Sequence, residues 1–188
     1  MKLEIICAGI GGRGVLLAST ILIETAIAAG LKASASDEYG MSQRGGSVIS
    51  LVKVGDFRSP LIGRENADVL ISFEESEFYR NLMFLKRGGM AIVNTQKKVL
   101  PDTVIGLLAE RETRCGLLDA DGIAKKKGMI QSANMAVLGF FSHFSMGPYT
   151  QESIGKTIQA RVPKRFLEKN LEVFREGYNE AKGKKREA

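Results

Sequence analysis

Three glycines near the amino terminus have the spacing Gly9-x-Gly11-x-x-Gly14, between an apolar run and a long helical pattern. Glycines at this spacing let the backbone turn tightly, and they leave the first N–H groups of the following helix free for a phosphate. Asp37 and Glu38 follow at about the 20-residue distance at which a dinucleotide-binding fold places its ribose-binding acid. The pattern predicts a nucleotide or phosphate site, and close packing of the helix on the strand is the alternative.

A second glycine-rich run, "YGMSQRGGSV", follows the two acids. A dinucleotide-binding half would continue into a helix here, whereas this chain enters a strand at once. Gly40, Gly45 and Gly46 can adopt positive φ and expose N–H groups, and Arg44 adds a fork of donors that suits carboxylates and phosphates. We therefore expect a loop that contacts an anion or a partner, against the alternative of a surface loop with an incidental arginine.

The remaining polar candidates are single residues. Asn94 ends the strand-like run "AIVN", at the edge where α/β proteins bind ligands, and Asn134 either caps a helix or reaches the same crevice. His143 lies in an apolar helical pattern and fits a core or interface residue better than a catalytic one. The chain shows neither a Ser–His–acid arrangement nor a Gly-x-Ser-x-Gly elbow, so the sequence identifies no catalytic residue.

Apolar runs and helical periodicity alternate along the chain and predict the elements that must position these residues. We expect strands at 3–8, 31–36, 47–54, 67–73, 90–95 and 115–120, and helices at 15–29, 74–85, 132–146, 150–160 and 163–181. Gly30 is placed as the residue just after the first helix. This alternation predicts an α/β fold, a three-layer, Rossmann-like, mostly parallel sheet with helices on both faces in a single domain. That domain spans residues 1–182, and 183–188 form a basic C-terminal tail.

Composition excludes several classes of function. The chain has 27 Lys and Arg against 21 Asp and Glu, but its basic clusters lack interleaved aromatic residues, so we expect no nucleic-acid binding. Two cysteines and one histidine cannot by themselves build a four-thiolate iron–sulfur cluster or a zinc site, so no metal site is expected in this chain. The most apolar stretch contains Glu24 and several hydroxyl residues, which argues against a membrane span and for a cytoplasmic protein.

Several segments, in one order, carry a resemblance to a known family: "GIGGRGVLLAS", "EYGMSQRGGSVISLVKVG", "SPLIG", "ADVLISFE", "GGMAIVNT", "SANMAVLG" and "VPKRFLEKNLEVFREGYNEA". Over nearly its whole length the chain resembles the small (beta) subunit of indolepyruvate ferredoxin oxidoreductases. This subunit is a version of the gamma domain found throughout the 2-oxoacid:ferredoxin oxidoreductases. Its most specific stretch, Met41 to Gly46, resembles the aryl-pyruvate branch more than the pyruvate and 2-oxoglutarate branches.

The resemblance implies a role within a larger oxidoreductase of anaerobic metabolism, in which a 2-oxoacid and coenzyme A give acyl-CoA, carbon dioxide and two electrons for ferredoxin. It places thiamine diphosphate, Mg and the iron–sulfur clusters on a large (alpha) subunit. This chain would then bind no cofactor alone and be inactive alone, with coenzyme A as a co-substrate of the complex. Separated from its partner, the chain is expected to be able to form a homodimer through the surface that the partner covers.

The resemblance and the glycine patterns together select one set of residues for a cofactor-binding, active-site or interface loop. They are Gly9, Gly11, Gly12, Gly14, Tyr39, Gly40, Ser42, Gln43, Arg44, Gly45, Gly46, Asn94 and Asn134. Two other functions stay open. The glycine turn with Asp37 or Glu38 fits a free-standing NAD(P)-binding oxidoreductase, and the apolar first helix fits a non-catalytic assembly protein.

Overall fold

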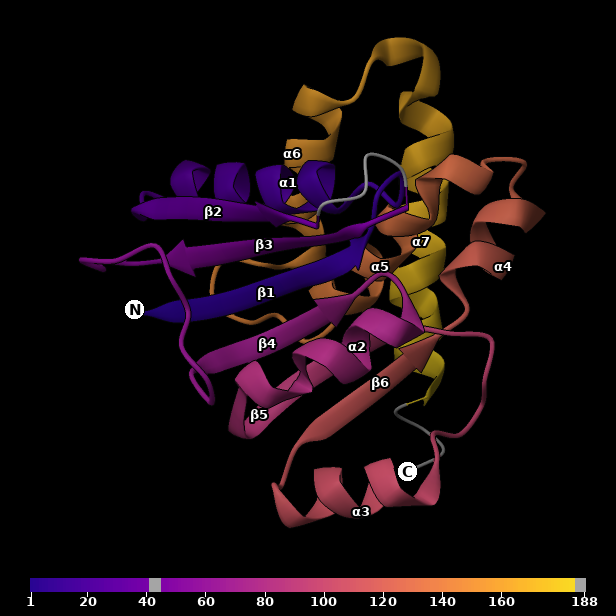
Figure 1. Cartoon of the computed structure of the whole chain (residues 1–188). Coiled ribbons are helices and arrows are strands. Elements are labelled where there is room, and N and C mark those ends of the chain that lie inside the picture. The colour runs from indigo at the N-terminus through magenta and orange to yellow at the C-terminus, as the bar shows by residue number, and fades with distance from the viewer. Residues whose placement is uncertain (41–44, 185–188) are drawn as a thin grey trace.

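The computed structural model describes residues 1–40 and 45–184. Its centre is a six-stranded sheet in the order β2-β3-β1-β4-β5-β6, which runs from top to bottom in Figure 1. The strands are β1 (Leu3–Ile10), β2 (Ala33–Tyr39), β3 (Ser47–Val54), β4 (Ala67–Ser72), β5 (Leu85–Asn94) and β6 (Arg114–Leu118). β1, β4, β5 and β6 pair in parallel, whereas β3 runs antiparallel to both of its neighbours, β1 and β2. The predicted mostly parallel sheet is confirmed.

The turn after β1 leads into helix α1 (Val15–Ala28), as the sequence predicts. Gly30 has a φ of 78°, a value that favours glycine, and the N–H of Leu31 donates to the carbonyl of Ala26 at 3.0 Å. This pattern is the Schellman motif, in which a left-handed glycine ends a helix. The placement of Gly30 just after the first helix is therefore confirmed.

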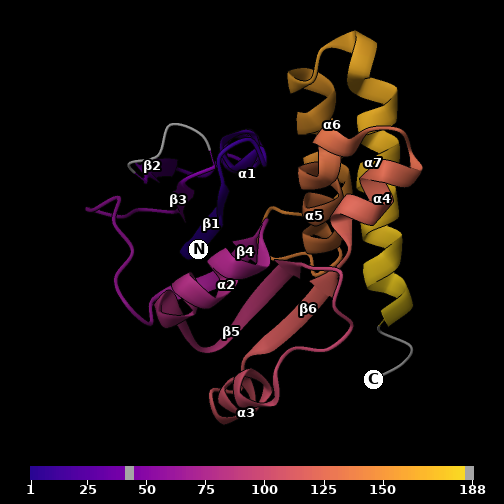
Figure 2. The same ribbon diagram turned by 45° about the vertical axis from the view of Figure 1, so that its right-hand side comes forward.

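Helices cover both faces of the sheet, and Figure 2 shows the resulting three layers. One face carries α1 with α4 (Ala120–Lys126), α5 (Ala133–Ser142), α6 (Gln151–Arg161) and α7 (Lys164–Lys184), and short 3₁₀ turn η2 (Ile130–Ser132) precedes α5. The other face carries α2 (Glu75–Asn81), 3₁₀ turn η1 (Leu82–Phe84) and α3 (Asp102–Glu110). Alternate residues of β1 enter the two cores, with Ile5 and Cys7 on one side and Ile6 and Ala8 on the other. Within the described parts of the chain, no helix is both long enough and apolar enough to cross a membrane.

The second strand differs from its expected position. We predicted it at 31–36, with Asp37 to Tyr39 in a loop, but β2 continues to Tyr39 and pairs there with Val48 of β3. β2 lies at the edge of the sheet, so its two acids stay exposed and the strand can include them without desolvating a charge. The run from Gly40 to Gly46 therefore connects the two strands of a β-hairpin.

Two other expectations need correction. The helix that begins at Glu75 has acids in its first turn as expected, but it ends at Asn81, and β5 already starts at Leu85. Gly88 and Gly89 lie inside β5, where the pairing with β4 shifts between Ala67 and Val69 to accommodate the extra residues. Helices α3 and α4 were not predicted, and α7 extends two residues into the segment 183–188 that we set apart as a tail.

Helices α5 and α7 approach each other through glycine. A β-carbon on Gly139 would lie 1.9 Å from the carbonyl oxygen of Phe174, and one on Gly177 would lie 1.9 Å from the carbonyl oxygen of Ala136. Both positions exclude any larger residue unless the helices move apart. The contact positions the helical layer against which α1 and the glycine turn are seated.

Candidate functional site

The glycine turn is built by contacts that leave little room for side chains. A β-carbon on Gly9 would lie 2.7 Å from Cγ2 of Val15, so this glycine permits close packing of α1 on the strand. Gly14 is the N-cap of α1 with a φ of 73°, and the N–H of Ala18 donates to its carbonyl at 3.0 Å. Nδ2 of Asn134, at the start of α5, also donates to that carbonyl at 3.2 Å. The structure thus brings Asn134 to the turn, 120 residues away in sequence.

The hairpin between β2 and β3 is bound directly to the turn. The N–H of Gly11 donates to the carbonyl of Gly46 at 2.9 Å, and the N–H of Gly40 donates to the carbonyl of Ser47 at 2.8 Å. From the other face of the sheet, the buried carboxylate of Glu77 accepts a hydrogen bond of 2.6 Å from Oγ of Ser47. The two glycine-rich segments that the sequence singled out are therefore parts of one structural unit.

A pocket of about 590 Å³ opens between the turn and the base of the hairpin. Its lining consists of turn backbone, hairpin backbone and apolar side chains: Ile10, Gly11, Gly12, Gly14, Val15, Leu16, Tyr39, Gly40, Gly46, Ser47 and Val48. Tyr39 stands at the rim with 63% of its surface exposed. Ser42, Gln43 and Arg44, which we also selected, lie outside the described residues, whereas Gly45 has a φ of 74°, the left-handed conformation expected of it.

The position of β3 argues against a dinucleotide site. In a dinucleotide-binding fold the ribose-binding acid ends the strand next to β1, but here β3 separates β1 from β2. Asp37 lies level with Ser50 of β3 and Cys7 of β1, which places it two strands from the turn's own strand, about 10 Å across the sheet. Its carboxylate accepts a hydrogen bond of 2.5 Å from Oγ of Ser50.

Arg13, inside the glycine motif, was not among the residues we selected. Its Nη2 lies 2.6 Å from Oε2 of Glu74, and its Nη1 lies 2.6 Å from Oδ1 of Asp121. Burial lowers the pKa of the guanidinium, but the hydrogen bonds and charges of the two carboxylates outweigh that effect and the pKa is raised. These ion pairs lie beyond the carboxyl ends of β1 and β4, where an open α/β sheet of this order would receive a nucleotide. A cation within the glycine motif is the sequence signal that could have pointed to this role.

Asn94 lies at the carboxyl end of β5, as expected, and its side chain holds this cluster together. Its Nδ2 donates to Oδ2 of Asp121 at 2.9 Å and to the carbonyl of Phe73 at 3.2 Å. Its Oδ1 accepts from the N–H of Ala120 at 2.9 Å. The amide thus orients Asp121 toward Arg13 and starts α4.

The two thiols are poor nucleophiles and poor metal ligands. Burial, and to a lesser degree the charge of Asp37, raises the pKa of Cys7 to about 12, and burial raises the pKa of Cys115 to about 12. Both side chains are therefore protonated at neutral pH. In the portion of the chain that the structure describes, no group of three or more His, Cys, Asp or Glu residues could hold a metal ion.

Comparison with known proteins assigns this arrangement to a family. The family model "Pyruvate ferredoxin/flavodoxin oxidoreductase" matches residues 4–180. The chain belongs to this family. Over 96% of its length it corresponds to the small subunit of 2-oxoacid:ferredoxin oxidoreductases, as the relatives below show.

Among sequence relatives of this family member, the indolepyruvate oxidoreductase subunit IorB of Archaeoglobus fulgidus is 35% identical, and the match covers 96% of both chains. Among solved structures, the gamma subunit of the keto/oxoacid ferredoxin oxidoreductase of Geobacter sulfurreducens has a TM-score of 0.77 and 26% identity, covering 96% of this chain and 99% of that one. The 2-oxoglutarate:ferredoxin oxidoreductase of Magnetococcus marinus, solved with 2-oxoglutarate, coenzyme A and succinyl-CoA bound, has a TM-score of 0.80 and 20% identity. This chain matches 31% of that longer chain and shares its fold.

Proposed function

We propose that this chain is the small subunit of an indolepyruvate ferredoxin oxidoreductase, which oxidatively decarboxylates aryl 2-oxoacids to acyl-CoA and passes the electrons to ferredoxin. The observation that carries the choice of substrate is the 35% identity, over nearly the full length of both chains, to the IorB subunit of Archaeoglobus fulgidus. The Met41–Gly46 stretch, which resembles the aryl-pyruvate branch, points the same way.

In this proposal the redox cofactors belong to a large partner subunit in the cytoplasm. An iron–sulfur cluster usually takes four thiolates, and this chain has two cysteines, both protonated at neutral pH. Thiamine diphosphate with its Mg ion, when bound to the partner, supplies the carbanion chemistry of the complex. The small subunit contributes shape and hydrogen-bond donors at the edge of that site.

The unit formed by the glycine turn and the hairpin is the part of this chain that we assign to the active-site edge. The pocket of about 590 Å³ exposes turn backbone and the amino-terminal end of the 14-residue helix α1, whose dipole favours an anion. Gly14 caps that helix without a side chain, so no N-cap side chain accepts from the first-turn N–H groups, and Gly14, Val15 and Leu16 line the pocket. A phosphate of coenzyme A suits such donors, and Arg44 from the connecting loop adds a cation of the kind that phosphates prefer.

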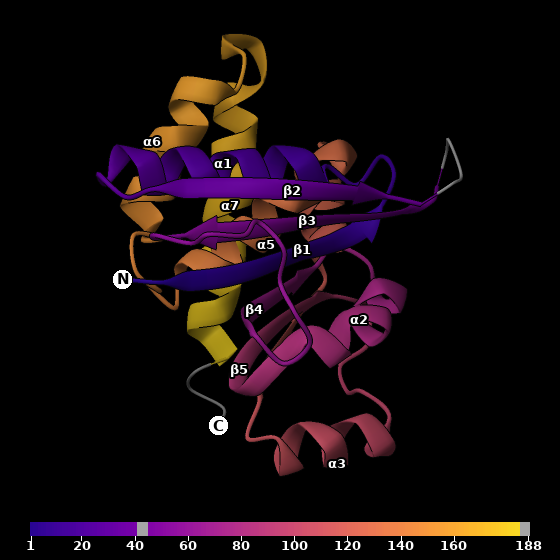
Figure 3. The same ribbon diagram turned by 60° about the vertical axis from the view of Figure 1, so that its left-hand side comes forward.

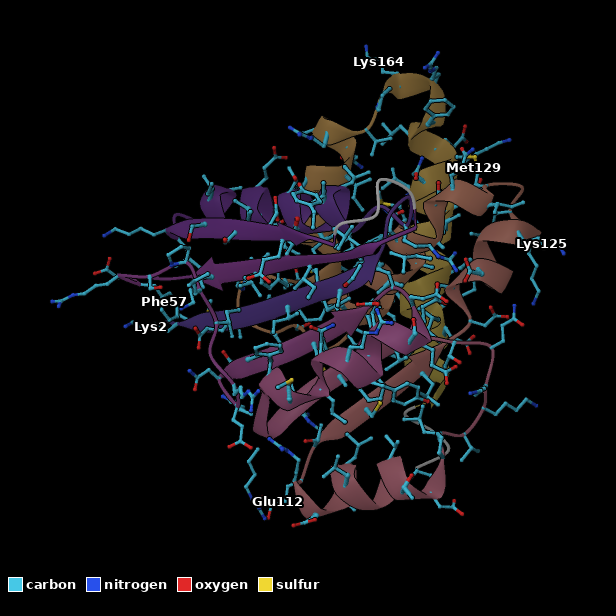
Figure 4. All side chains as sticks on the ribbon, in the orientation of Figure 1. Lys2, Phe57, Glu112, Lys125, Met129 and Lys164 are labelled. Atoms are coloured by element: carbon cyan, nitrogen blue, oxygen red, sulfur yellow. The ribbon has the colours of Figure 1, made fainter. Side chains whose placement is uncertain are left out.

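Arg44→Ala in the reconstituted two-subunit enzyme tests this assignment. Loss of one charge-assisted hydrogen bond should lower kcat/KM for coenzyme A by roughly 10- to 100-fold, while the variant still folds and binds the large subunit. Arg58→Ala is the matched control, because Arg58 is an exposed arginine next to Phe57, which Figure 4 labels at the opposite end of the sheet. If both variants were as active as the parent enzyme, the assignment of this loop to the coenzyme A site would be wrong.

A titration separates this function from that of a free-standing NAD(P)-binding enzyme. The complex should bind coenzyme A in isothermal titration calorimetry, and the isolated small subunit should show no saturable binding of NAD or NADP at millimolar concentration. Saturable NAD binding by the isolated chain, or oxidation of an arylpyruvate by it without a partner, would contradict the proposal.

A further inference from the structure

The outer edge of strand β2 carries a row of backbone groups directed away from the sheet. The N–H of Gly40 donates to Ser47 of β3, and the carbonyl of Lys32 accepts from Gly55 just after β3. The backbone groups of the even-numbered residues between them therefore point toward β3. The N–H and C=O groups of Ala33, Ala35 and Asp37 consequently point outward. Among the described strands, only β3 pairs with β2, so this row is a template for another strand.

This edge has few of the features by which proteins block pairing with another strand. β2 reads "ASASDEY", with neither proline nor lysine, and its pairing with β3 runs without a bulge. Ala33 and Ala35 face the α1 side and leave space above the edge for a neighbouring helix. The other sheet edge, β6, is shorter, with five residues against seven.

An apolar stripe of α1 continues the same surface. Leu16, Ile23 and Ile27 lie on one side of the helix, and Leu16 and Ile27 are 37% and 55% exposed. Leu16 lines the same pocket as Tyr39 of β2, which places the stripe on the β2 side. The opposite side of α1 packs on α6, through the buried hydrogen bond of 2.8 Å between Thr25 and Thr157. Figure 3 shows α1 lying along β2 at this edge of the molecule.

We propose that this surface binds a second copy of the chain, with the two β2 strands antiparallel about a twofold axis at Ala35. The outward groups of Ala35 in one copy would bond to those of Ala35 in the other. Lys32 of one copy would then stand opposite Glu38 of the second copy, on the same face of the joined sheet. The inference goes beyond the function proposed above and does not depend on the substrate or on the large subunit.

Charge favours this register, in which the exposed Lys32, already 2.8 Å from Asp56 of its own chain, would also meet Glu38 of the second copy. Moving the axis by one residue, to Ser36, keeps the outward groups paired but places Lys32 opposite Gly40 and leaves Glu38 opposite Ser34. With the axis at Ala35, the side chains of Asp37 and Ala33 meet, so no like charges face each other across the new pair. A twofold interface brings the same patch of both copies together, so the α1 stripe of each copy would lie on the same face of the joined sheet, where Leu16 and Ile27 are exposed.

A second copy in this position reaches the candidate site. In the proposed register Leu31 of the second copy lies opposite Tyr39, and Tyr39 forms the rim of the pocket beside the glycine turn. Each pocket is therefore flanked by residues of both copies. The dimer supplies a reason for an exposed tyrosine at that rim.

Symmetric disulfide trapping tests the register. Ala35→Cys, in a full-length chain that also carries Cys115→Ser, should oxidise to a covalent dimer, because paired Cα atoms at the axis lie about 5.5 Å apart. Ser36→Cys in the same background is the matched control, since its two copies would be about 7–8 Å apart and on a diagonal. Failure of Ala35→Cys to cross-link, or preferential cross-linking of Ser36→Cys, would overturn the proposal.

Sedimentation velocity tests the interface without oxidation. The purified full-length chain should sediment as a dimer, and Lys32→Glu or Ile27→Glu should weaken dimerisation by about tenfold or more. The double variant Lys32→Glu with Glu38→Lys should recover the dimer, since the charges are exchanged. Ile130→Glu, at an exposed residue of η2, should leave the dimer unchanged. A parent chain that remains monomeric at about 100 μM would also overturn the proposal.

Discussion

Asn134 occupies the space in which a β-carbon on Gly14 would lie. Its Nδ2 donates to the carbonyl oxygen of Gly14 at 3.2 Å, and it would stand only 2.4 Å from that β-carbon. A residue of α5 therefore fixes the point at which the glycine turn becomes helix α1. The shape of the candidate site depends on the helical layer beneath it as much as on its own glycines.

Gly14→Ala should destabilise the domain for two separable reasons. The left-handed φ costs an alanine about 1 kcal/mol, and the clash with Asn134 adds to it. Gly12→Ala is the matched control, because Gly12 also has positive φ, but its β-carbon would have open space. In urea, the free energy of unfolding of Gly14→Ala should be lower than that of Gly12→Ala. The double variant Gly14→Ala with Asn134→Ala should recover part of that difference. Equal stability of the two glycine variants would show that the clash is relieved at no cost.

Arg13→Ala should destabilise the turn by about 1–2 kcal/mol, a value that allows for the partial exposure of all three charged side chains. The substitution leaves Glu74 and Asp121 without the cation between them. Arg13→Lys should recover less than half of the loss, since an ammonium cannot fork between two carboxylates as a guanidinium does. Thermal unfolding at low and high salt measures the stability lost in Arg13→Ala and the part recovered in Arg13→Lys. If lysine restored the full stability, the forked contact of Arg13 with two carboxylates would not be what stabilises the turn.

The stability of the domain should depend on Glu75 between pH 2 and pH 4.5. Hydrogen bonds from Lys97, Thr95 and Tyr79 lower the pKa of Glu75 from 4.5 to about 2. A depressed pKa stabilises the fold above the unfolded value and loses that contribution as the pH falls through the folded value. Because the Lys97 side chain is 57% exposed, solvent screening limits this contribution to about 1–2 kcal/mol.

Glu75→Gln should accordingly be less stable than the parent at pH 7, and the two unfolding free energies should converge near pH 2. Urea unfolding across this range provides the measurement. Glu152→Gln is the control, because Glu152 forms a fully exposed pair with Lys156 and should change little. A difference between Glu75→Gln and parent that is independent of pH would contradict the assigned cause.

Gly139→Ala and Gly177→Ala should each destabilise the domain by about 3 kcal/mol or more, because the added carbon meets a carbonyl oxygen at 1.9 Å. Gly106→Ala in α3 is the opposite case, since nothing lies within 4 Å of its β-carbon, and alanine should stabilise that helix by about 1 kcal/mol. Thermal unfolding of the three variants measures these changes in stability. A tolerated alanine at position 139 would mean that α5 and α7 can separate freely.

The parts of the fold that were predictable are those in which local pattern and tertiary structure agree. The apolar run of β1, the glycine motif and Gly30 each determine the backbone conformation of only a few neighbouring residues, so their effects can be read from the local sequence. The direction of β3 leaves no trace in its alternation of side chains, so its antiparallel insertion between β1 and β2 was not predictable. β2 extends over Asp37 and Glu38 because an edge strand keeps its acids in solvent, which outweighs their low strand propensity.

The candidate site divides in the same way. The glycines of the turn and hairpin were predictable from backbone freedom alone. Asn134 was expected to cap a helix or reach the crevice beside Asn94, but Ser132 is the N-cap of α5 and Asn134 donates to the carbonyl of Gly14. Arg13 was missed because its partners, Glu74 and Asp121, lie 61 and 108 residues away, beyond the reach of any local motif. The hydrogen bond between Gly11 and Gly46 likewise joins two glycine segments that no single local motif contains. Contacts of this kind become visible only when the sheet order is known.

The glycine contact between α5 and α7 also bears on when the chain is prone to aggregate during folding. Helix α5 is buried along its whole length, and α7 packs against it backbone to backbone. A folding intermediate in which α7 has not yet docked exposes an apolar helix to other chains. Docking of α7 is therefore the step that removes this risk.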